Sequence, residues 1–255
     1  MPELPEAETI ARTLAPLVEG RSILNAEFPG RRVLRGLMPD LAGARILRVE
    51  RHGKRIVLSL DHGSVLVSLG MTGALLVDSP PGPYTRAIFT LSGSTLLFDD
   101  IRQFGNLRFL AAADESLGPD PLEITAIDFT ARLRARRTVA KRILLDQAFV
   151  RGLGNIYADE ALHRARIHPT AATASMSHAR AARLHAAIVE LLNEAIAHRG
   201  SSISDYVDAN GERGGFQLLH RVYRKQGQPC PTCGTPIQRI VLAQRGTHFC
   251  PRCQR

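Results

Sequence analysis

The spacing of hydrophobic positions divides the chain into a first helix, a β-rich half and a helical half. A helix is predicted from Pro5 onward, because apolar residues recur there every three to four positions and would form one face. These residues are Ile10, Leu14, Leu17 and Val18. Pro16 lies inside this pattern and is expected to kink the helix or end its regular hydrogen bonding.

From about residue 21 to residue 110 the pattern is that of short strands. Two hairpins are predicted where a short turn separates two apolar runs, at residues 55–60 with 64–69 and at residues 87–91 with 95–98. Several short strands with regular turns and no alternating helices favour an antiparallel sandwich or barrel. We therefore expect a first domain over residues 1–116, followed by a proline-containing linker over residues 117–128.

The remainder of the chain is predicted to be helical and then to end in a short tail. Residues 129–138 and 139–149 carry apolar faces beneath arginines, and residues 159–166 continue a helical pattern. Ser177 is a candidate N-cap for a long helix that Gly200 would end. The expected units are a helical domain over residues 129–215, with a glycine-rich loop near its end, and a tail domain over residues 221–255. The fold class is α+β.

The composition indicates a soluble globular protein with a basic surface. The 255 residues are 44% hydrophobic and 22% charged, and no apolar run approaches the roughly 20 residues of a membrane span. No secretory signal pattern is present, so a cytosolic location is expected. Lysine and arginine number 33 against 24 acidic residues, a net charge of +9 that favours a polyanionic partner such as nucleic acid. A basic surface that serves only solubility is the alternative.

All four cysteines lie in the tail, as two C-x2-C pairs. Cys230 and Cys233 form the first pair, and Cys250 and Cys253 form the second, 16 residues later. This spacing is typical of one structural zinc ion held by four thiolates. Two disulfides are the competing interpretation, which a reducing cytosol disfavours.

The N-terminus carries candidate chemistry. Removal of Met1 would leave Pro2 with a free secondary amine, a nucleophile that titrates near neutral pH. Attack on an aldehydic or glycosidic carbon would give an iminium, and the carboxyl group of Glu3 could move the proton. A disordered Met-Pro terminus without function is the alternative that these residues alone leave open.

Six segments together resemble the formamidopyrimidine-DNA glycosylase and endonuclease VIII family, and specifically its formamidopyrimidine branch. They are Pro2-Glu-Leu-Pro-Glu6, Leu69-Gly-Met-Thr-Gly73, Arg102-Gln-Phe-Gly105, Leu144-Leu-Asp-Gln147, the segment from Gly152 to Glu160, and the cysteine tail with Gln244-Arg-Gly246. The resemblance covers essentially the whole chain. It implies an N-terminal β-sandwich with flanking helices, a helix–two-turn–helix domain with a zinc finger, and a monomer.

The resemblance also implies a reaction in base-excision repair. The enzyme would excise oxidised purines, 8-oxoguanine and formamidopyrimidines, from duplex DNA through a Schiff base at the N-terminal proline, and would cleave the strand at the abasic site by β,δ-elimination. Pro2 would be the nucleophile and Glu3 the general acid and base. Lys54 would assist β-elimination and contact a phosphate near the lesion, and Arg245 would assist δ-elimination.

Further DNA contacts follow from the same resemblance. An enzyme that extrudes a base needs apolar side chains to fill the gap, and Met71 and Phe104 lie in glycine-flanked loops. With Arg102 facing the orphaned cytosine, they would form the wedge. The other implied DNA contacts are Tyr84, Arg136, Lys141 and Asn155. Asn155 could also be a helix N-cap, and Glu6 and Glu160 are either pocket carboxylates or partners of a helix dipole.

Four positions depart from the family pattern: Ser68, Tyr84, Arg55 and Arg224. None of them removes a catalytic group, but they bear on lesion preference, as does the loop from Ser204 to Gly215. Two other functions stay open. One is an endonuclease VIII-like activity on oxidised pyrimidines, against which Leu4 and the Met71, Arg102 and Phe104 set argue. The other is a zinc-ribbon DNA-binding protein without catalysis.

Overall fold

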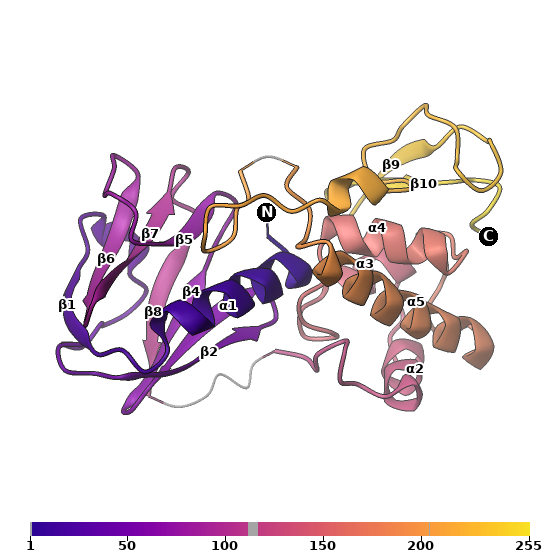
Figure 1. Ribbon diagram of the computed structural model, residues 1–255. Coiled ribbons are helices and arrows are strands. Elements are labelled where there is room, and N and C mark those ends of the chain that lie inside the picture. Colours follow the sequence, from indigo (N-terminus) through magenta and orange to yellow (C-terminus); the bar gives the residue numbers. More distant parts are fainter. Residues whose placement is uncertain (1, 112–116, 204) are drawn as a thin grey trace. The chain divides into compact units, whose positions relative to one another are not determined.

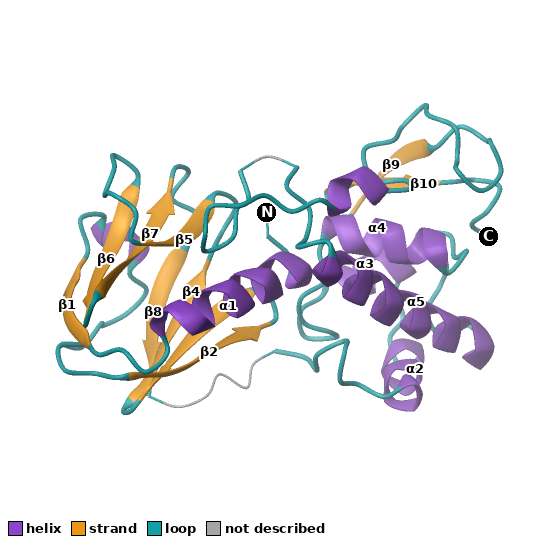
Figure 2. Ribbon diagram, viewed as in Figure 1, coloured by secondary structure: helices purple, strands orange, loops and turns teal. Residues whose placement is uncertain are grey.

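The computed structural model describes residues 2–111, 117–203 and 205–255 and groups the chain into two compact units. The first unit contains Met1–Glu115 and Ile196–Gln217, and the second contains Ser116–Ala195 and Leu218–Arg255. Met1, Ser204 and the expected domain end at residue 116 lie outside the described residues. Figure 1 labels the elements along the chain, and Figure 2 separates helices from strands.

Two antiparallel sheets form the body of the first unit, which confirms the predicted sandwich. One sheet has the order β1-β6-β7-β5 and the other the order β2-β3-β4-β8. The strands are β1 (Ile23–Glu27), β2 (Ile46–His52), β3 (Arg55–Leu60), β4 (Gly63–Ser68), β5 (Gly73–Val77), β6 (Thr85–Leu91), β7 (Ser94–Asp100) and β8 (Asn106–Leu110). A short 3-10 helix, η1 (Arg31–Val33), lies between β1 and β2 in the chain. Both predicted hairpins are present, as β3–β4 and β6–β7.

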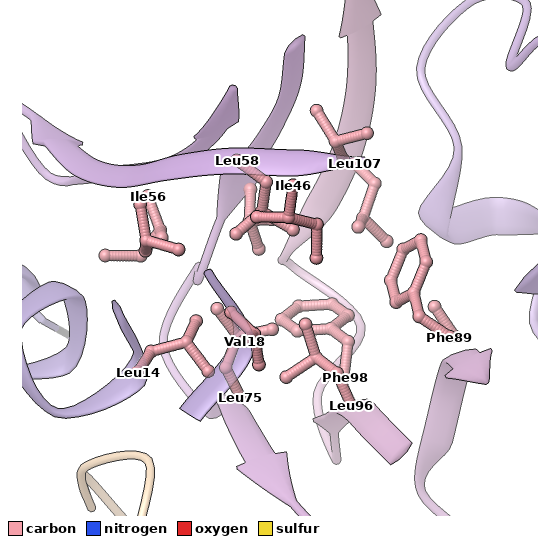
Figure 3. Close-up of a cluster of buried hydrophobic side chains, with 14 of the residues drawn as sticks. Leu14, Val18, Ile46, Ile56, Leu58, Leu75, Phe89, Leu96, Phe98 and Leu107 are labelled. Atoms are coloured by element: carbon pink, nitrogen blue, oxygen red, sulfur yellow. The ribbon is translucent and has the colours of Figure 1, made fainter. Parts of the chain in front are cut away.

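Helix α1 (Leu4–Val18) packs its apolar face into the same core as the strands. Leu14 and Val18 lie in one cluster with Ile56, Phe89 and Phe98 (Figure 3). Along β3 the buried positions alternate with half-buried ones, so one strand face supplies the core. The helix runs two residues beyond Pro16 before it ends at Val18.

The second unit consists of helices and a two-stranded hairpin. The helices are α2 (Ala126–Arg134), α3 (Ala140–Leu145), α4 (Asn155–Arg164) and α5 (His178–Ala197), the last of which ends in the first unit. Thr125 caps α2 by accepting from Asp128 N at 3.1 Å, and the hydroxyl of Ser177 accepts from Arg180 N at 3.3 Å. The hairpin pairs β9 (Gln238–Leu242) with β10 (Arg245–Phe249).

The two units do not follow sequence order. Residues 196–217 return to the first unit, where Tyr206 and Ala209 join the core of the sandwich. The short 3-10 helix η2 (Phe216–Leu219) spans the second crossing between the units. The expected linker also contains structure, because α2 begins at Ala126. Across the described ranges, no helix combines the length and apolar character that a membrane crossing requires.

Candidate active site

Pro2 and Glu3 lie directly before α1 and are held there by Glu6. Both residues are buried, as is Glu6 itself. The backbone N–H of Glu3 donates to Glu6 Oε2 at 2.7 Å, and Ser201 N donates to Glu6 Oε1 at the same distance. Gly200 has a φ of +75°, and a Cβ there would lie 2.7 Å from Glu6 Oε1, so this close approach requires glycine. Glu6 therefore positions the N-terminal residues by fixing backbone groups of two distant segments.

Lys54 lies in the two-residue turn between β2 and β3 and is half-buried. This hairpin is tied to α1 by an ion pair between Arg51 Nε and Glu8 Oε2, at 2.8 Å. Burial raises the pKa of Glu8, but hydrogen bonds and charge from Arg51 and Arg12 outweigh it, so the pKa is lowered overall. The ion pair thus links the turn that carries Lys54 to the helix that begins beside Glu3.

Met71, Arg102 and Phe104 lie together on two loops of the first unit, residues 69–73 and 101–105, which we call the wedge loops. The guanidinium of Arg102 donates to Met71 Sδ at 3.2 Å and lies 4.8 Å from the ring centroid of Phe104. Met71 is 37% and Phe104 is 57% exposed, so neither side chain belongs to the core. The structure brings the three predicted residues into one exposed group with an apolar surface and a cation.

A buried carboxylate and two glycines fix these loops. Asp100 accepts from the Thr72 hydroxyl and, at 2.7 Å, from Gly105 N. Gly70 has a φ of +60°, and a Cβ there would lie 2.5 Å from Gly105 N. The two wedge loops therefore touch through their backbones, and a larger residue at position 70 would separate them. Tyr84 is 47% exposed, and its carbonyl accepts from Asp100 N at 2.9 Å.

In the second unit, four arginines line one open cavity of about 640 Å³. They are Arg136, Arg137, Arg142 and Arg245. All four side chains are exposed, and they come from the segment before α3, from α3 itself and from the start of β10. Two of them, Arg136 and Arg245, are sequence-predicted site residues. Guanidinium groups grouped in this way suit a phosphate backbone, because each offers paired donors to phosphate oxygens.

Lys141, which the resemblance gave as a DNA contact, has no exposed surface. Its ammonium donates to Asp159 Oδ1 at 2.7 Å and to Asn155 O at 3.0 Å. The other oxygen of Asp159 accepts from His248 N at 2.9 Å and lies 3.1 Å from His248 Nδ1. Through this buried ion pair Lys141 joins α3, α4 and β10.

Asn155 is also placed differently from the N-cap interpretation. Gly154 is the N-cap of α4, and Asn155 is its first helical residue. The side-chain amide of Asn155 donates to Gly246 O at 2.9 Å, one residue after Arg245. The amide therefore holds the hairpin tip onto α4.

Glu160 likewise serves the protein's own backbone. It accepts from the N–H groups of Arg221, Val222 and Tyr223 at 2.8–3.0 Å. Burial raises its pKa, while these three hydrogen bonds act in the opposite direction. The carboxylate thus fixes the segment that leads into the first cysteine pair.

The four cysteine sulfurs fit one zinc ion. All lie within 4.8 Å of one another, with 3.9 Å between Cys230 and Cys253 and 3.4 Å between Cys233 and Cys250. A tetrahedral site with Zn–S bonds of about 2.3 Å separates its sulfurs by about 3.8 Å. A disulfide would need about 2.05 Å. The tail therefore holds one structural zinc ion, as predicted.

Comparison with known proteins decides the family. The formamidopyrimidine-DNA glycosylase N-terminal domain model matches residues 1–107, and the H2TH domain model of the same enzymes matches residues 117–207. The zinc finger found in FPG and IleRS matches residues 227–255. The chain belongs to the formamidopyrimidine-DNA glycosylase family. This membership assigns it the class of a DNA glycosylase and abasic-site lyase in base-excision repair.

Individual relatives agree with the family over the full length. The formamidopyrimidine-DNA glycosylase of Solibacter usitatus is 52% identical, and 100% of each chain is covered. The crystal structure of the MutM (Fpg) protein from Thermus thermophilus has a TM-score of 0.91 at 42% identity, covering 99% of this chain and 98% of that one. A Lactococcus lactis Fpg bound to DNA with an abasic site has the same TM-score at 33% identity, with 99% of both chains covered.

Sequence reasoning missed several residues that hold this glycosylase's site together. Asp100, Thr72, Asp159 and His248 were not singled out as positioning residues, because a lone acid or histidine in a strand or helix has no diagnostic spacing. Ile101, which is 51% exposed beside Arg102, adds to the apolar surface of the wedge loops. An isoleucine directly before the Arg102-Gln-Phe-Gly105 motif was the available signal.

Proposed function

We propose that this enzyme excises oxidised purines from duplex DNA through an imine at Pro2 and then cleaves the strand by β,δ-elimination. One observation supports the proposal most: in a chain of this family, Glu6 fixes the backbone N–H of Glu3, directly after the buried Pro2, and also that of Ser201. A relative from Lactococcus lactis was crystallised with DNA containing Fapy-dG, at 33% identity over 100% of both chains with a TM-score of 0.91. That supports an oxidised purine as the substrate.

In the proposed first step, the nitrogen of Pro2 attacks C1′ of the damaged nucleotide and the bond to the base breaks. Glu3 gives a proton to the sugar ring oxygen, so the ring opens and an iminium forms. The iminium acidifies the C2′ proton, whose removal expels the 3′ phosphate. Loss of a second proton expels the 5′ phosphate, and hydrolysis of the imine then frees Pro2. Lys54 assists the first elimination, and Arg245 assists the second.

The wedge loops supply the base-extrusion part of this proposal. Met71 and Phe104 would enter the stack left by the damaged base, and Arg102 would face the orphaned cytosine. The contacts that Arg102 makes with both side chains support this role, because they present cation and wedge as one group. Tyr84 is proposed as a neighbouring backbone contact.

The arginine-lined cavity supplies the backbone contacts. Log affinity for DNA should fall linearly with log salt concentration, since each phosphate contact releases condensed counter-ions. Arg136→Ala is expected to reduce the steepness of that dependence by about one ion. An unchanged slope in this variant would place the DNA backbone elsewhere on the protein.

Borohydride trapping tests the chemistry directly. The intact protein is incubated with a duplex carrying 8-oxoguanine opposite cytosine, and a Pro2→Gly variant and an undamaged duplex serve as controls. A covalent adduct that forms only on the damaged duplex and is lost or sharply reduced in Pro2→Gly is the expected result. Glu3→Gln should form the adduct on an abasic duplex but excise the base slowly.

Other outcomes would change the proposal in defined ways. An adduct on an abasic duplex but not on the 8-oxoguanine duplex would keep the imine chemistry and move the substrate to another base, oxidised pyrimidines first. No adduct on either duplex would reject the imine mechanism.

A further inference from the structure

Helix α4 holds the zinc finger at several points, and one of them is the metal site itself. Asn155 binds the hairpin tip, Asp159 binds His248 in β10, and Glu160 binds the segment before the first cysteine pair. In the last turn of the helix, His163 Nε2 lies 3.5 Å from Cys230 Sγ. His163 is only 4% exposed, so its ring faces the sulfur from inside the protein.

Two of the other thiolates, those of Cys250 and Cys233, receive hydrogen bonds from the zinc finger itself. Cys253 N donates to Cys250 Sγ at 3.4 Å, and Thr235 hydrogen-bonds to Cys233. His163, in contrast, belongs to a helix more than sixty residues earlier in the chain. Its contact is therefore the point at which the metal site meets the helical part of the unit.

The surroundings of the His163 ring determine which of its two nitrogens carries a hydrogen in the neutral form. An imidazolium carries an N–H on both ring nitrogens, Nε2 included. A neutral imidazole carries one N–H, on Nδ1 or on Nε2. Nδ1 has no hydrogen-bond partner among the described residues. A proton on Nδ1 would leave a buried donor unsatisfied and point the Nε2 lone pair at an anionic sulfur, so the Nε2–H form has the lower free energy.

We propose that His163 is a positioning residue of the zinc site: its Nε2–H donates to the Cys230 thiolate, orients that ligand and ties the metal to α4. A zinc ion with four thiolates carries a formal charge of −2, and a donor to sulfur spreads that charge. Outer contacts of this kind commonly change metal affinity by about 10–100-fold. The role concerns zinc retention, so it stands or falls independently of the proposed DNA chemistry.

The test compares three variants of the full, zinc-loaded chain. His163→Phe keeps the ring but removes the donor, and His163→Gln restores an N–H at a similar reach. His185→Phe is the matched control, because His185 lies on α5 and contacts Ile124 O at 3.0 Å. The readouts are zinc transfer to a competing chelator and, after cobalt replacement, the energy of the thiolate-to-cobalt charge-transfer band.

The expected result is zinc retention weakened by about 10–100-fold in His163→Phe, with the cobalt band shifted to lower energy. His163→Gln and His185→Phe should stay close to wild type. If His163→Phe does not fold, His163→Asn replaces it, since its shorter amide does not reach the sulfur. Wild-type retention and band energy in the donor-free variant would overturn the proposal. Equal losses in His163→Phe and His163→Gln would also overturn it, because they would show that the ring only fills space.

Discussion

The wedge loops and the zinc-finger hairpin both present exposed side chains on a tight turn, but they are supported by cores of different size. Each presents exposed side chains on a tight turn with a left-handed residue, Gln103 in one and the pair Ala243 and Gln244 in the other. Each is also anchored by one buried aspartate, Asp100 or Asp159. In one region the carboxylate accepts a backbone N–H of the exposed loop itself, and in the other it accepts one from the buried part of the strand that follows the exposed turn.

What lies beneath the two regions differs. The wedge loops grow from strands whose apolar residues share the large core of the sandwich and α1. The buried cluster of the zinc finger contains little more than Val222, Ile237 and the cysteines themselves. A core that small cannot offset the conformational entropy of the segment, so the metal and the contacts with α4 must supply the remaining stability.

Removal of zinc should therefore produce the largest difference in stability between the two regions. We expect the tail from about residue 227 to unfold and DNA binding to be lost, while the sandwich keeps its structure, because the metal stabilises only the small cluster. Hydrogen exchange after chelation measures both regions at once. Metal-free protein that protects the β9 and β10 amides, or binds DNA fully, would contradict the comparison. Re-addition of zinc is the control.

Loss of the Asp159 charge should have the next largest effect. Asp159→Asn leaves the fully buried ammonium of Lys141 without its counter-ion, a change that typically costs about 3–5 kcal/mol. Urea unfolding measures the loss. The double variant Asp159→Asn with Lys141→Met removes both charges and should recover much of the stability. If Asp159→Asn is as stable as the double variant, the unpaired ammonium of Lys141 does not cause the loss of stability.

Acid should also act more strongly on the second unit. Burial, followed by the charges of Lys225 and Arg224, lowers the pKa of His220 to about 4 from an ordinary value of 6.5. The folded state disfavours protonation, so the contribution is fully present above pH 6.5 and is lost as the pH falls toward 4. The linkage amounts to about 2 kcal/mol between pH 7.5 and pH 5. By contrast, the lowered pKa of Glu8 matters only below its ordinary value of 4.5.

Urea unfolding at pH 7.5 and pH 5 tests this dependence. His220→Phe, which does not titrate, should lose less stability across the interval than wild type. Equal losses in the two proteins would assign the acid sensitivity to other groups.

Features that depend on local spacing could be predicted from the sequence, and features that depend on long-range contacts could not. The hairpins, the zinc site and the exposed wedge residues follow from local spacing, since period-two alternation, C-x2-C pairs and glycine-flanked apolar residues are visible within a few positions. The return of residues 196–217 to the sandwich depends on contacts such as Glu6 with Ser201, which lie 195 positions apart. No local pattern indicates such a pairing.

Lys141 shows a second limit of prediction from sequence, which concerns the role of a single charged residue. The family resemblance implied a DNA contact for this lysine, yet its ammonium forms an ion pair with Asp159, on a different helix. Sequence indicates that a lysine is present, but its role depends on whether tertiary structure supplies a buried counter-ion. Asn155 is a similar case, since its partner Gly246 lies 91 residues away.

Neutralising Asp100 tests the anchor of the wedge loops. Asp100→Asn keeps the shape of the side chain but weakens its bonds to Thr72 and Gly105, at a cost of about 1–2 kcal/mol. Asp99→Asn is the matched control, because the Asp99 carboxylate accepts from the Thr85 hydroxyl, at 2.7 Å, on the neighbouring strand β6. Stacking of a fluorescent base opposite an abasic site reports the wedge, and only the Asp100 variant should alter it. Identical fluorescence signals from both variants would show that Asp100 does not hold the wedge loops in place.

The smallest expected effect concerns the hairpin tip. Ala243 and Gln244 adopt φ values of 49° and 58°, and non-glycine residues rarely adopt such values. Two-residue turns of this kind favour Asn-Gly, so the double variant Ala243→Asn with Gln244→Gly should stabilise the hairpin by about 1 kcal/mol. The gain should appear as slower hydrogen exchange at β9 and β10 and leave the sandwich unchanged. The variant Gln103→Gly is the corresponding change in the wedge loops. Because the zinc finger has only a small core, the double variant should slow hydrogen exchange in the hairpin more than Gln103→Gly slows it in the wedge loops. A larger response in the wedge loops would mean that core size does not set how strongly local backbone strain is felt.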